Sequence, residues 1–175
     1  MTAPPFILTA LVFLPALAGA VVALMPKDQV RTIRAFVVNF GAVHVLLTVL
    51  LFIGFDRSNP NPQFVDRLPW VPAFGIEYYL GVDGLSITLV LLTSLLFFLA
   101  TLVALKVDHR VRDFFALVLI LESGVLGVFT ALDLFLFFLF WEVELLPLYL
   151  LIAIWGTGRK EYSAMKFLIY TFAGS

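Results

Sequence analysis

The sequence feature that most constrains this chain is an apolar stretch from Leu134 to Trp155, reading LFLFFLFWEVELLPLYLLIAIW. At about 1.5 Å of rise per residue, a helix of this length crosses the hydrocarbon core of a bilayer, which is about 30 Å thick. Glu142 and Glu144 nevertheless lie near its centre, where an ionised side chain costs about 2.5 to 3.5 kcal/mol. Carboxyl groups at such a depth are typical of ion or proton pathways, so the stretch predicts one.

The composition is that of a polytopic membrane protein. Hydrophobic residues make up 62% of the chain and charged residues 13%, whereas soluble domains contain about 25% charged residues. No basic face suited to nucleic acid is evident, so the expected surroundings are the lipid bilayer. The sequence contains no cysteine, which excludes disulfides, thiolate nucleophiles and cysteine-bound zinc or iron–sulfur clusters in this chain.

The spacing of the apolar runs predicts an all-α polytopic fold with five full transmembrane helices and the start of a sixth. The predicted single transmembrane region has helices at residues 5–25, 35–54, 84–105, 114–132, 134–155 and 162–175. Because the last run gives only about four turns, we expect the chain to be the front part of a longer polypeptide. The proline-rich and aromatic segment 55–80 predicts an external loop, in which residues 74–80 form one arm of a small surface hairpin.

Two aspartates stand directly before predicted helices. Asp83, in the segment GVDGLS, and Asp133 each occupy the position of an N-cap, where a carboxylate accepts hydrogen bonds from free backbone N–H groups. For Asp83 we prefer this capping role over a functional one.

The distribution of basic residues predicts an orientation in the membrane. If the loops alternate between the two sides, one side holds Lys27, Arg31, Arg34, Lys106, Arg110, Arg112, Arg159 and Lys160, and the other holds Arg57 and Arg67. Basic loops stay in the cytoplasm, so the N-terminus and the proline-rich loop are expected on the periplasmic or lumenal side.

Helical geometry separates the two central glutamates. At about 100° per residue, Glu142 and Glu144 are about 160° apart and cannot face the same partner. Both faces of the helix are apolar and aromatic, so the residues alone do not identify the working carboxyl. Pro147 lacks the N–H that would bind the Val143 carbonyl, which favours a kink and a polar pocket beside both carboxyl groups.

Three further polar residues lie within predicted helices. Counted at about 1.5 Å per residue from the cytoplasmic helix ends, Glu142 lies about 20 Å deep, Glu122 about 12 Å and Lys166 about 6 Å. We therefore hypothesise that Glu122 and Lys166 form an ion pair that feeds protons toward Glu142. The alternative for Lys166 is that its side chain extends to the nearby interface. His44 is expected to be a neutral, hydrogen-bonded structural residue rather than a proton relay or metal ligand.

Other site chemistries fit these residues poorly. Paired carboxyl groups also serve glycosidases and metal centres, but helices buried in lipid offer neither a polar cleft nor further ligands. The segment GTGRK lacks the full spacing of a phosphate-binding loop and joins two membrane helices, which argues against a nucleotide site.

Three segments carry a resemblance to a known family: GVDGLS (81–86), GVFTALDLFLFFLFWEVELLPLYLLIAIWG (127–156) and MKFLIYTFAGS (165–175). They resemble the antiporter-like, proton-channelling membrane subunit of respiratory complex I and its photosynthetic relatives, of the chain M or subunit 4 type. The most specific part is FWE followed by a proline five residues after the glutamate, and then the YxLIxxWG run. The match covers about residues 75–175 well, and the first two helices in pattern only.

The resemblance implies a fold of about fourteen helices with two inverted repeats, of which this chain is the front part. It implies that Glu142 is the carboxyl central to pumping, with a lysine on a seventh helix as its partner. Lys166 corresponds to a less central lysine of the family, and Glu144 and Glu122 to positions that are not uniformly acidic. No cofactor is expected in this chain. NAD(P)H or ferredoxin, FMN, iron–sulfur clusters and quinone are expected in partner subunits of the same membrane assembly.

The implied function is proton translocation by an NADH (or ferredoxin/NADPH):quinone oxidoreductase of a bacterial plasma membrane or thylakoid-type membrane. One alternative is a subunit of a multisubunit cation/proton antiporter or of a membrane-bound hydrogenase. A second alternative is a structural membrane scaffold, in which the acidic side chains only join helices by hydrogen bonds.

Overall fold

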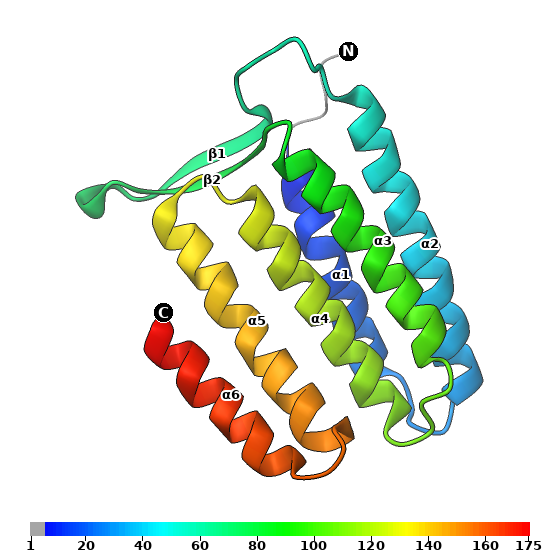
Figure 1. Cartoon of the computed structure of the whole chain (residues 1–175). Coiled ribbons are helices and arrows are strands. Elements are labelled where there is room, and N and C mark those ends of the chain that lie inside the picture. The colour runs from blue at the N-terminus through cyan, green and yellow to red at the C-terminus, as the bar shows by residue number, and fades with distance from the viewer. Residues whose placement is uncertain (1–5) are drawn as a thin grey trace.

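The computed structural model describes residues 6–175 and shows a bundle of helices with a β-hairpin across one end (Figure 1). In the described part of the chain, the helices are α1 (Ile7–Leu24), α2 (Val30–Gly54), α3 (Ser86–Ala104), α4 (Val111–Thr130), α5 (Leu134–Trp155) and α6 (Lys160–Gly174). Within residues 6–175, helices α1 to α5 are each long and apolar enough to cross a membrane. The predicted all-α membrane fold is confirmed, while Pro5, the predicted start of the first helix, lies outside the described residues.

Some helix boundaries differ from the prediction. Helices α2, α4 and α6 begin at Val30, Val111 and Lys160, earlier than the predicted residues 35, 114 and 162. Their first turns carry charged side chains that the prediction placed in loops, because hydropathy alone ends a helix where charges begin. The structure extends these helices into the polar boundary region, where Arg34 donates to the carbonyl of Val107 at 2.9 Å and contacts Asp108 at 2.7 Å.

The segment between α2 and α3 forms the hairpin. Strand β1 (Gln63–Val71) pairs antiparallel with β2 (Ile76–Val82), and a short helical turn, η1 (Pro72–Phe74), connects them. Strand β2 contains most of the arm predicted at residues 74–80. The hairpin is tied to the turn before α5, because the N–H of Leu132 donates to the carbonyl of Tyr79 at 2.9 Å and the N–H of Glu77 donates to the Asp133 carboxylate at 3.3 Å.

The hairpin also caps the first helix. Asp66 of β1 is buried, with 4% of its surface exposed, and its carboxylate accepts hydrogen bonds of 2.8 Å from the backbone N–H groups of Phe6 and Thr9. The hydroxyl of Thr9 donates to the same carboxylate at 2.8 Å, and the hydroxyl of Tyr78 donates to Thr9 at 2.9 Å. Because the first N–H groups of a helix have no partner within the helix, Asp66 supplies from the hairpin the acceptor that α1 lacks.

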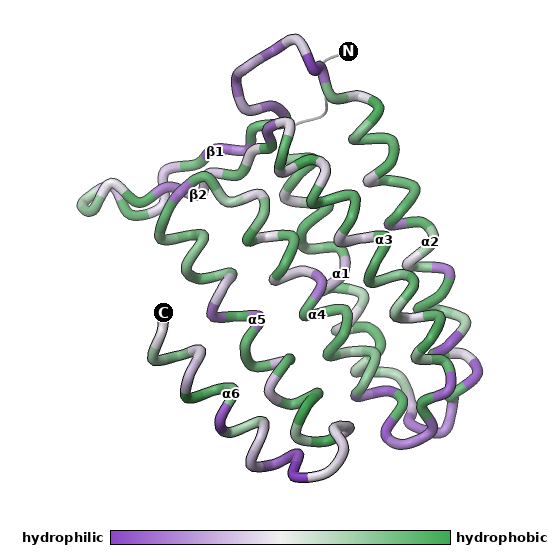
Figure 2. Tube along the Cα trace, viewed as in Figure 1, coloured by the Kyte–Doolittle hydropathy of each residue, from purple (hydrophilic) through white to green (hydrophobic). Residues whose placement is uncertain are grey.

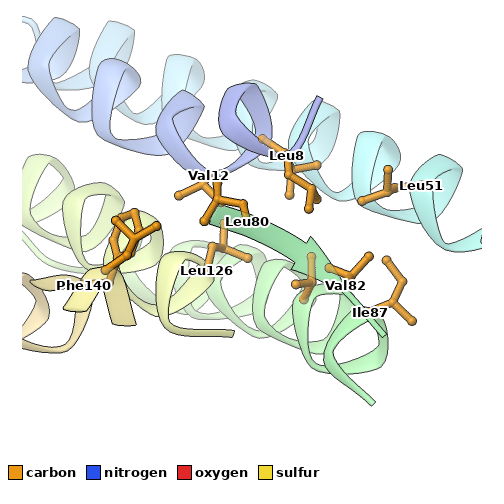
Figure 3. Packing of buried hydrophobic residues seen from close by; sticks show 11 residues of the cluster. Leu8, Val12, Leu51, Leu80, Val82, Ile87, Leu126 and Phe140 are labelled. Atoms are coloured by element: carbon orange, nitrogen blue, oxygen red, sulfur yellow. The ribbon is translucent and has the colours of Figure 1, made fainter. Parts of the chain in front are cut away.

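Two apolar clusters hold the bundle together. Helix α1 packs mainly on α4, α4 also packs on α5, and α2 packs on α3. The cluster under the hairpin joins β2 to the helix ends; its labelled members in Figure 3 are Leu8, Val12, Leu51, Leu80, Val82, Ile87, Leu126 and Phe140. The second cluster, near the opposite end, contains Ala18, Val22, Ile33, Val37, Val111, Phe115, Ala116 and Leu119.

The two ends of the bundle differ in polarity. The hairpin and the turn between α4 and α5 lie at one end, and the connections α1–α2, α3–α4 and α5–α6 lie at the other (Figure 1). Hydrophilic positions gather at the α1–α2 and α3–α4 connections, whereas the helices between the two ends are predominantly hydrophobic (Figure 2). The loops that were predicted to be on the basic side therefore share one end of the structure.

A first prediction concerns the cap on α1. Asp66→Ala removes the acceptor of three hydrogen bonds and leaves partly buried donors without partners, so the free energy of unfolding should fall by about 1 to 3 kcal/mol. Unfolding of the detergent-solubilised protein by increasing SDS would measure the change. Asp56→Ala is the control, because that exposed carboxylate bonds only to Ser58 in its own turn, and its midpoint should match the wild type. Equal midpoints for all three proteins would contradict the capping role.

A second prediction concerns the contact between α4 and α5. A Cβ atom at Gly127 would collide with the ring of Phe140, so Gly127→Ala must displace the ring or push the two helices apart. Overpacking of this kind costs about 1 to 3 kcal/mol of unfolding free energy, measured in the same SDS titration. At Gly84 a Cβ would meet nothing within 4 Å, so Gly84→Ala should be neutral. A Gly127→Ala protein as stable as the Gly84→Ala protein would show that the helices do not pack this closely.

Candidate functional site

Helix α5 begins where the sequence predicted. Asp133 is its N-cap, and its carboxylate accepts hydrogen bonds from the N–H groups of Phe135 at 2.9 Å and Leu136 at 3.0 Å. The helix then continues to Trp155 with Pro147 inside it. The missing N–H of Pro147 leaves the carbonyl of Val143 without its helical donor, one residue from each central glutamate.

Asp83 accepts the predicted hydrogen bonds at the start of α3, although the helix begins at Ser86, two residues later than predicted. Its carboxylate accepts hydrogen bonds from the N–H groups of Leu85 at 3.0 Å and Ser86 at 2.7 Å. The hydrogen bond from the Ser86 backbone N–H, followed by the hydrogen bond with the Ser86 side chain, lowers the pKa of Asp83. The carboxyl group therefore stays ionised at the positive end of the helix.

Glu144 lies on the face of α5 that packs against α4. A Cβ atom at Gly124 of α4 would come within 3.1 Å of the Glu144 Cβ, so the two backbones approach closely at this level. Phe140, one turn away on the same face of α5, is buried against Gly127. The glycines of α4 thus provide the room that lets Glu144 and Phe140 face it.

Glu142 lies on the other side of α5. Its side chain is half-buried, and its Oε1 atom is inaccessible and has no hydrogen-bond partner among residues 6–175. Helix α6 packs on α5. A hollow of about 390 Å³ separates the two helices next to Trp141, and it is lined by Phe137, Phe138, Trp141, Tyr170, Thr171, Gly174 and Ser175. The structure therefore gives the two central glutamates different surroundings, a distinction that the sequence did not make.

The partner of Glu122 differs from the prediction. Glu122 Oε1 lies 3.0 Å from Nδ1 of His44, and 5% and 1% of the two side chains is exposed. This distance is that of an ion pair, but Oε1 does not lie along the direction in which a hydrogen on Nδ1 would point, so the contact is not a regular hydrogen bond. Within residues 6–175, the structure contains no ion pair between Glu122 and Lys166, so the predicted pair is not formed.

The reason is which helices are neighbours: α6 packs on α5, and α5 lies between α6 and α4 (Figure 1). Counted at about 1.5 Å per residue from Val111, where α4 begins, Glu122 lies about 16 Å from the basic end rather than the predicted 12 Å. Lys166 lies about 9 Å from the start of α6, is exposed, and has its Nζ 5.7 Å from the ring centre of Tyr170. Glu122 instead points into the bundle, where α2 supplies His44.

Pro15 of α1 explains why a histidine fits there. A proline has no N–H, so the carbonyl of Leu11, four residues earlier, lacks its helical donor. Nε2 of His44 lies 3.1 Å from that carbonyl oxygen, and the hydroxyl of Ser123 donates to the next carbonyl, that of Val12, at 2.6 Å. In the sequence, Pro15 and His44 fall in consecutive predicted helices. The backbone carbonyl that Pro15 leaves without a donor could have predicted a hydrogen bond from His44.

Comparisons with known proteins identify similar sequences and folds. A model of the transmembrane region of the NADH:quinone oxidoreductase/Mrp antiporter family matches residues 131–175. Over 169 residues, the chain is 43% identical to an NAD(P)H-quinone oxidoreductase chain 4 of Microcystis aeruginosa and 45% identical to one of Picosynechococcus sp.. Both alignments cover 96% of this chain and 31% of the relative, so the chain spans about a third of the length of these relatives.

Two solved structures share the fold. A chain of respiratory complex I from Thermus thermophilus with bound NADH matches with a TM-score of 0.81 and 30% identity, covering 96% of this chain and 33% of that chain. A chain of an archaeal membrane-bound sulfane sulfur reductase matches with a TM-score of 0.74 and 20% identity, covering 94% of this chain and 25% of that chain; at this identity only the fold is shared. This chain is an integral membrane protein that belongs to the NADH:quinone oxidoreductase/Mrp antiporter family and corresponds to the N-terminal part of its chain 4 members.

Proposed function

We propose that this protein is a proton-translocating membrane subunit of an NAD(P)H or ferredoxin:quinone oxidoreductase, in which Glu142 is the carboxyl that takes up and releases the proton. The names of the curated relatives support the type of complex. The observation that supports the residue is the Oε1 atom of Glu142, which is inaccessible and has no hydrogen-bond partner among residues 6–175, in the middle of a membrane-spanning helix.

An unpaired carboxyl in such a place is sensitive to nearby charge. Desolvation favours its neutral form, whereas a cation that approaches it favours its ionised form. A lysine on a later helix, as the family resemblance implies, would therefore load and release a proton at Glu142 as it withdraws and approaches. The coupling is electrostatic, and the protein needs no redox centre of its own for it.

The remaining acidic and basic residues have secondary roles in this proposal. Glu144 faces α4 and serves as an auxiliary carboxyl at about the same depth. Lys166 lies on α6 between Glu142 and the basic end, where its positive charge guides proton entry. Glu122 does not feed Glu142 through Lys166, because it is held by His44.

The proposed surroundings follow from the relatives and from the charge distribution. Other membrane subunits of a complex I-like assembly would surround this chain, and NAD(P)H or ferredoxin, FMN, iron–sulfur clusters and quinone would bind to partner subunits. The end of the structure with the basic connections would face the cytoplasm, which places the N-terminus and the hairpin on the periplasmic or lumenal side.

Two alternative functions make different predictions. The matched family model also covers Mrp antiporters, so a subunit of a cation/proton antiporter remains the second candidate. Subunits that co-purify with the protein, and electron transfer to quinone in those preparations, distinguish the two. In a purely structural scaffold, neutralising Glu142 would lower the amount of assembled complex and leave proton translocation per complex unchanged.

Glu142→Gln tests the proposal. The amide has the size of the carboxyl but cannot release a proton, so proton translocation per electron transferred should fall at least about tenfold. Acidification of inverted membrane vesicles, normalised to the amount of assembled complex, would measure it. An undiminished proton gradient in the Glu142→Gln complex would contradict the assignment.

Glu144→Gln provides the matched comparison, two residues away on the same helix. Its effect on proton translocation should be smaller than that of Glu142→Gln, because it faces α4 rather than the unpaired side of α5. Equal losses in both variants would show that the two carboxyl groups act as a unit.

A further inference from the structure

A polar layer crosses the bundle between its two apolar clusters, away from the face of α5 that carries Glu142. On α2, His44 lies between Val37 of one cluster and Leu51 of the other. On α4, Glu122 and Ser123 likewise lie between Leu119 and Leu126. On α1, Pro15 separates Val12 from Ala18. The layer therefore has apolar packing above and below it.

The contacts of His44 fix the position of one proton. A backbone carbonyl oxygen only accepts hydrogen bonds, so Nε2, which lies 3.1 Å from the Leu11 oxygen, must be the protonated nitrogen. If Nδ1 had no proton and Glu122 were ionised, two electron-rich atoms, Nδ1 and a carboxylate oxygen, would lie 3.0 Å apart without being directly aligned. That contact is repulsive in a site from which water is excluded. One additional proton, on either Nδ1 or Oε1, removes the repulsion.

We propose that His44 and Glu122 together form a proton-binding site that holds one exchangeable proton. The proton lies either on Nδ1, which gives an imidazolium and a carboxylate, or on Oε1, which gives a neutral imidazole and a carboxylic acid. Both forms have zero net charge, which is the state that costs least in an apolar layer. Release of the proton leaves the pair with a charge of −1, and its return restores neutrality.

The structure holds the imidazole in one orientation. The ring of Phe40 stacks on that of His44, with centroids 5.7 Å apart and an angle of 12° between the planes. Together with the hydrogen bond to Leu11, this stacking keeps Nδ1 on the side of the ring that is next to Glu122 of α4. A fixed ring keeps the acceptor and donor atoms at a constant distance, which a proton-binding pair requires.

The neighbouring helices place few other titratable groups near the pair. Helices α1 and α3 contain no titratable side chain, and α3 contributes only neutral polar groups such as the buried Ser94. Helix α5 carries Glu142, Glu144 and Tyr149, and it is Glu144 that packs on α4 beside Gly124. At the hairpin end, strand β1 brings Asp66 and Arg67, and strand β2 brings Glu77, Tyr78 and Tyr79. Among the charged side chains of the neighbouring helices, Glu144 is therefore the one shown to pack on the helix that carries Glu122.

Infrared spectroscopy of membranes that contain the complete assembled protein tests the site. Spectra of each protein are recorded in H₂O and after transfer to D₂O, and the H₂O-minus-D₂O difference spectrum is calculated. The difference spectrum of each variant is then compared with that of the wild type. A shared, exchangeable proton should give a D₂O-sensitive carboxyl or imidazolium band in the wild type that is lost in Glu122→Gln. His44→Gln should lose the same band, because the proton belongs to the pair; it also serves as the test if Glu122→Gln does not assemble.

Ser94→Ala is the control, because it removes a buried hydroxyl that bonds only to Val90 in its own helix, and it should retain the band. The inference is overturned if neither variant loses a D₂O-sensitive band, or if His44→Gln leaves the Glu122 signal unchanged. Glu142→Gln should retain the band whatever its effect on proton translocation, so this result is independent of the function proposed for Glu142.

Discussion

The missing N–H of Pro15 is the constraint on which much of this bundle depends. Backbone polar groups inside a membrane protein must find partners within the protein, because the lipid offers none. The carbonyl of Leu11, deprived of its helical donor, is satisfied by His44 from α2, and Ser123 from α4 binds the adjacent carbonyl of Val12. The carbonyl freed by Pro15 thus links α1 to α2 at mid-depth, beside the Ser123 contact that links α1 to α4, and it holds His44 where it meets Glu122.

The same principle explains the role of the hairpin. The first N–H groups of α1 also lack helical partners, and Asp66 satisfies them from β1. Strand β2 inserts Leu80 and Val82 among the helix ends and is hydrogen-bonded to the turn before α5 (Figure 3). The hairpin therefore fixes the ends of α1 and α5, the two helices on either side of α4, and with them the level at which the acidic residues lie.

Helix α5 uses its two sides for different purposes. The side with Phe140 and Glu144 packs closely on α4, where Gly124 and Gly127 leave room for it. The side with Glu142 has no charged partner among the described residues, although burying a carboxyl without one is costly. A residue kept at such a cost in a membrane helix is a reason to expect function there, and the close packing on the opposite side keeps α5 in place.

Much of this arrangement could be predicted from the sequence. Continuous apolar runs predicted the five spanning helices. The carboxylates of Asp83 and Asp133, which stand just before apolar runs, predicted hydrogen bonds to the first N–H groups of two helices. The resemblance also indicated the family correctly. The early starts of α2, α4 and α6 were not predicted, because hydropathy does not distinguish a charged first turn from a charged loop.

The sequence by itself determined the class of the protein, the number of residues between polar positions, and the separation of Glu142 from Glu144 around the helix. These properties follow from covalent spacing and from helical geometry, which act within one segment. Only the tertiary structure decided which face of α5 meets α4, and that Glu122 pairs with His44 rather than with Lys166. Those outcomes depend on how deep each helix sits and which neighbour it contacts, and both are set by packing between segments far apart in the chain.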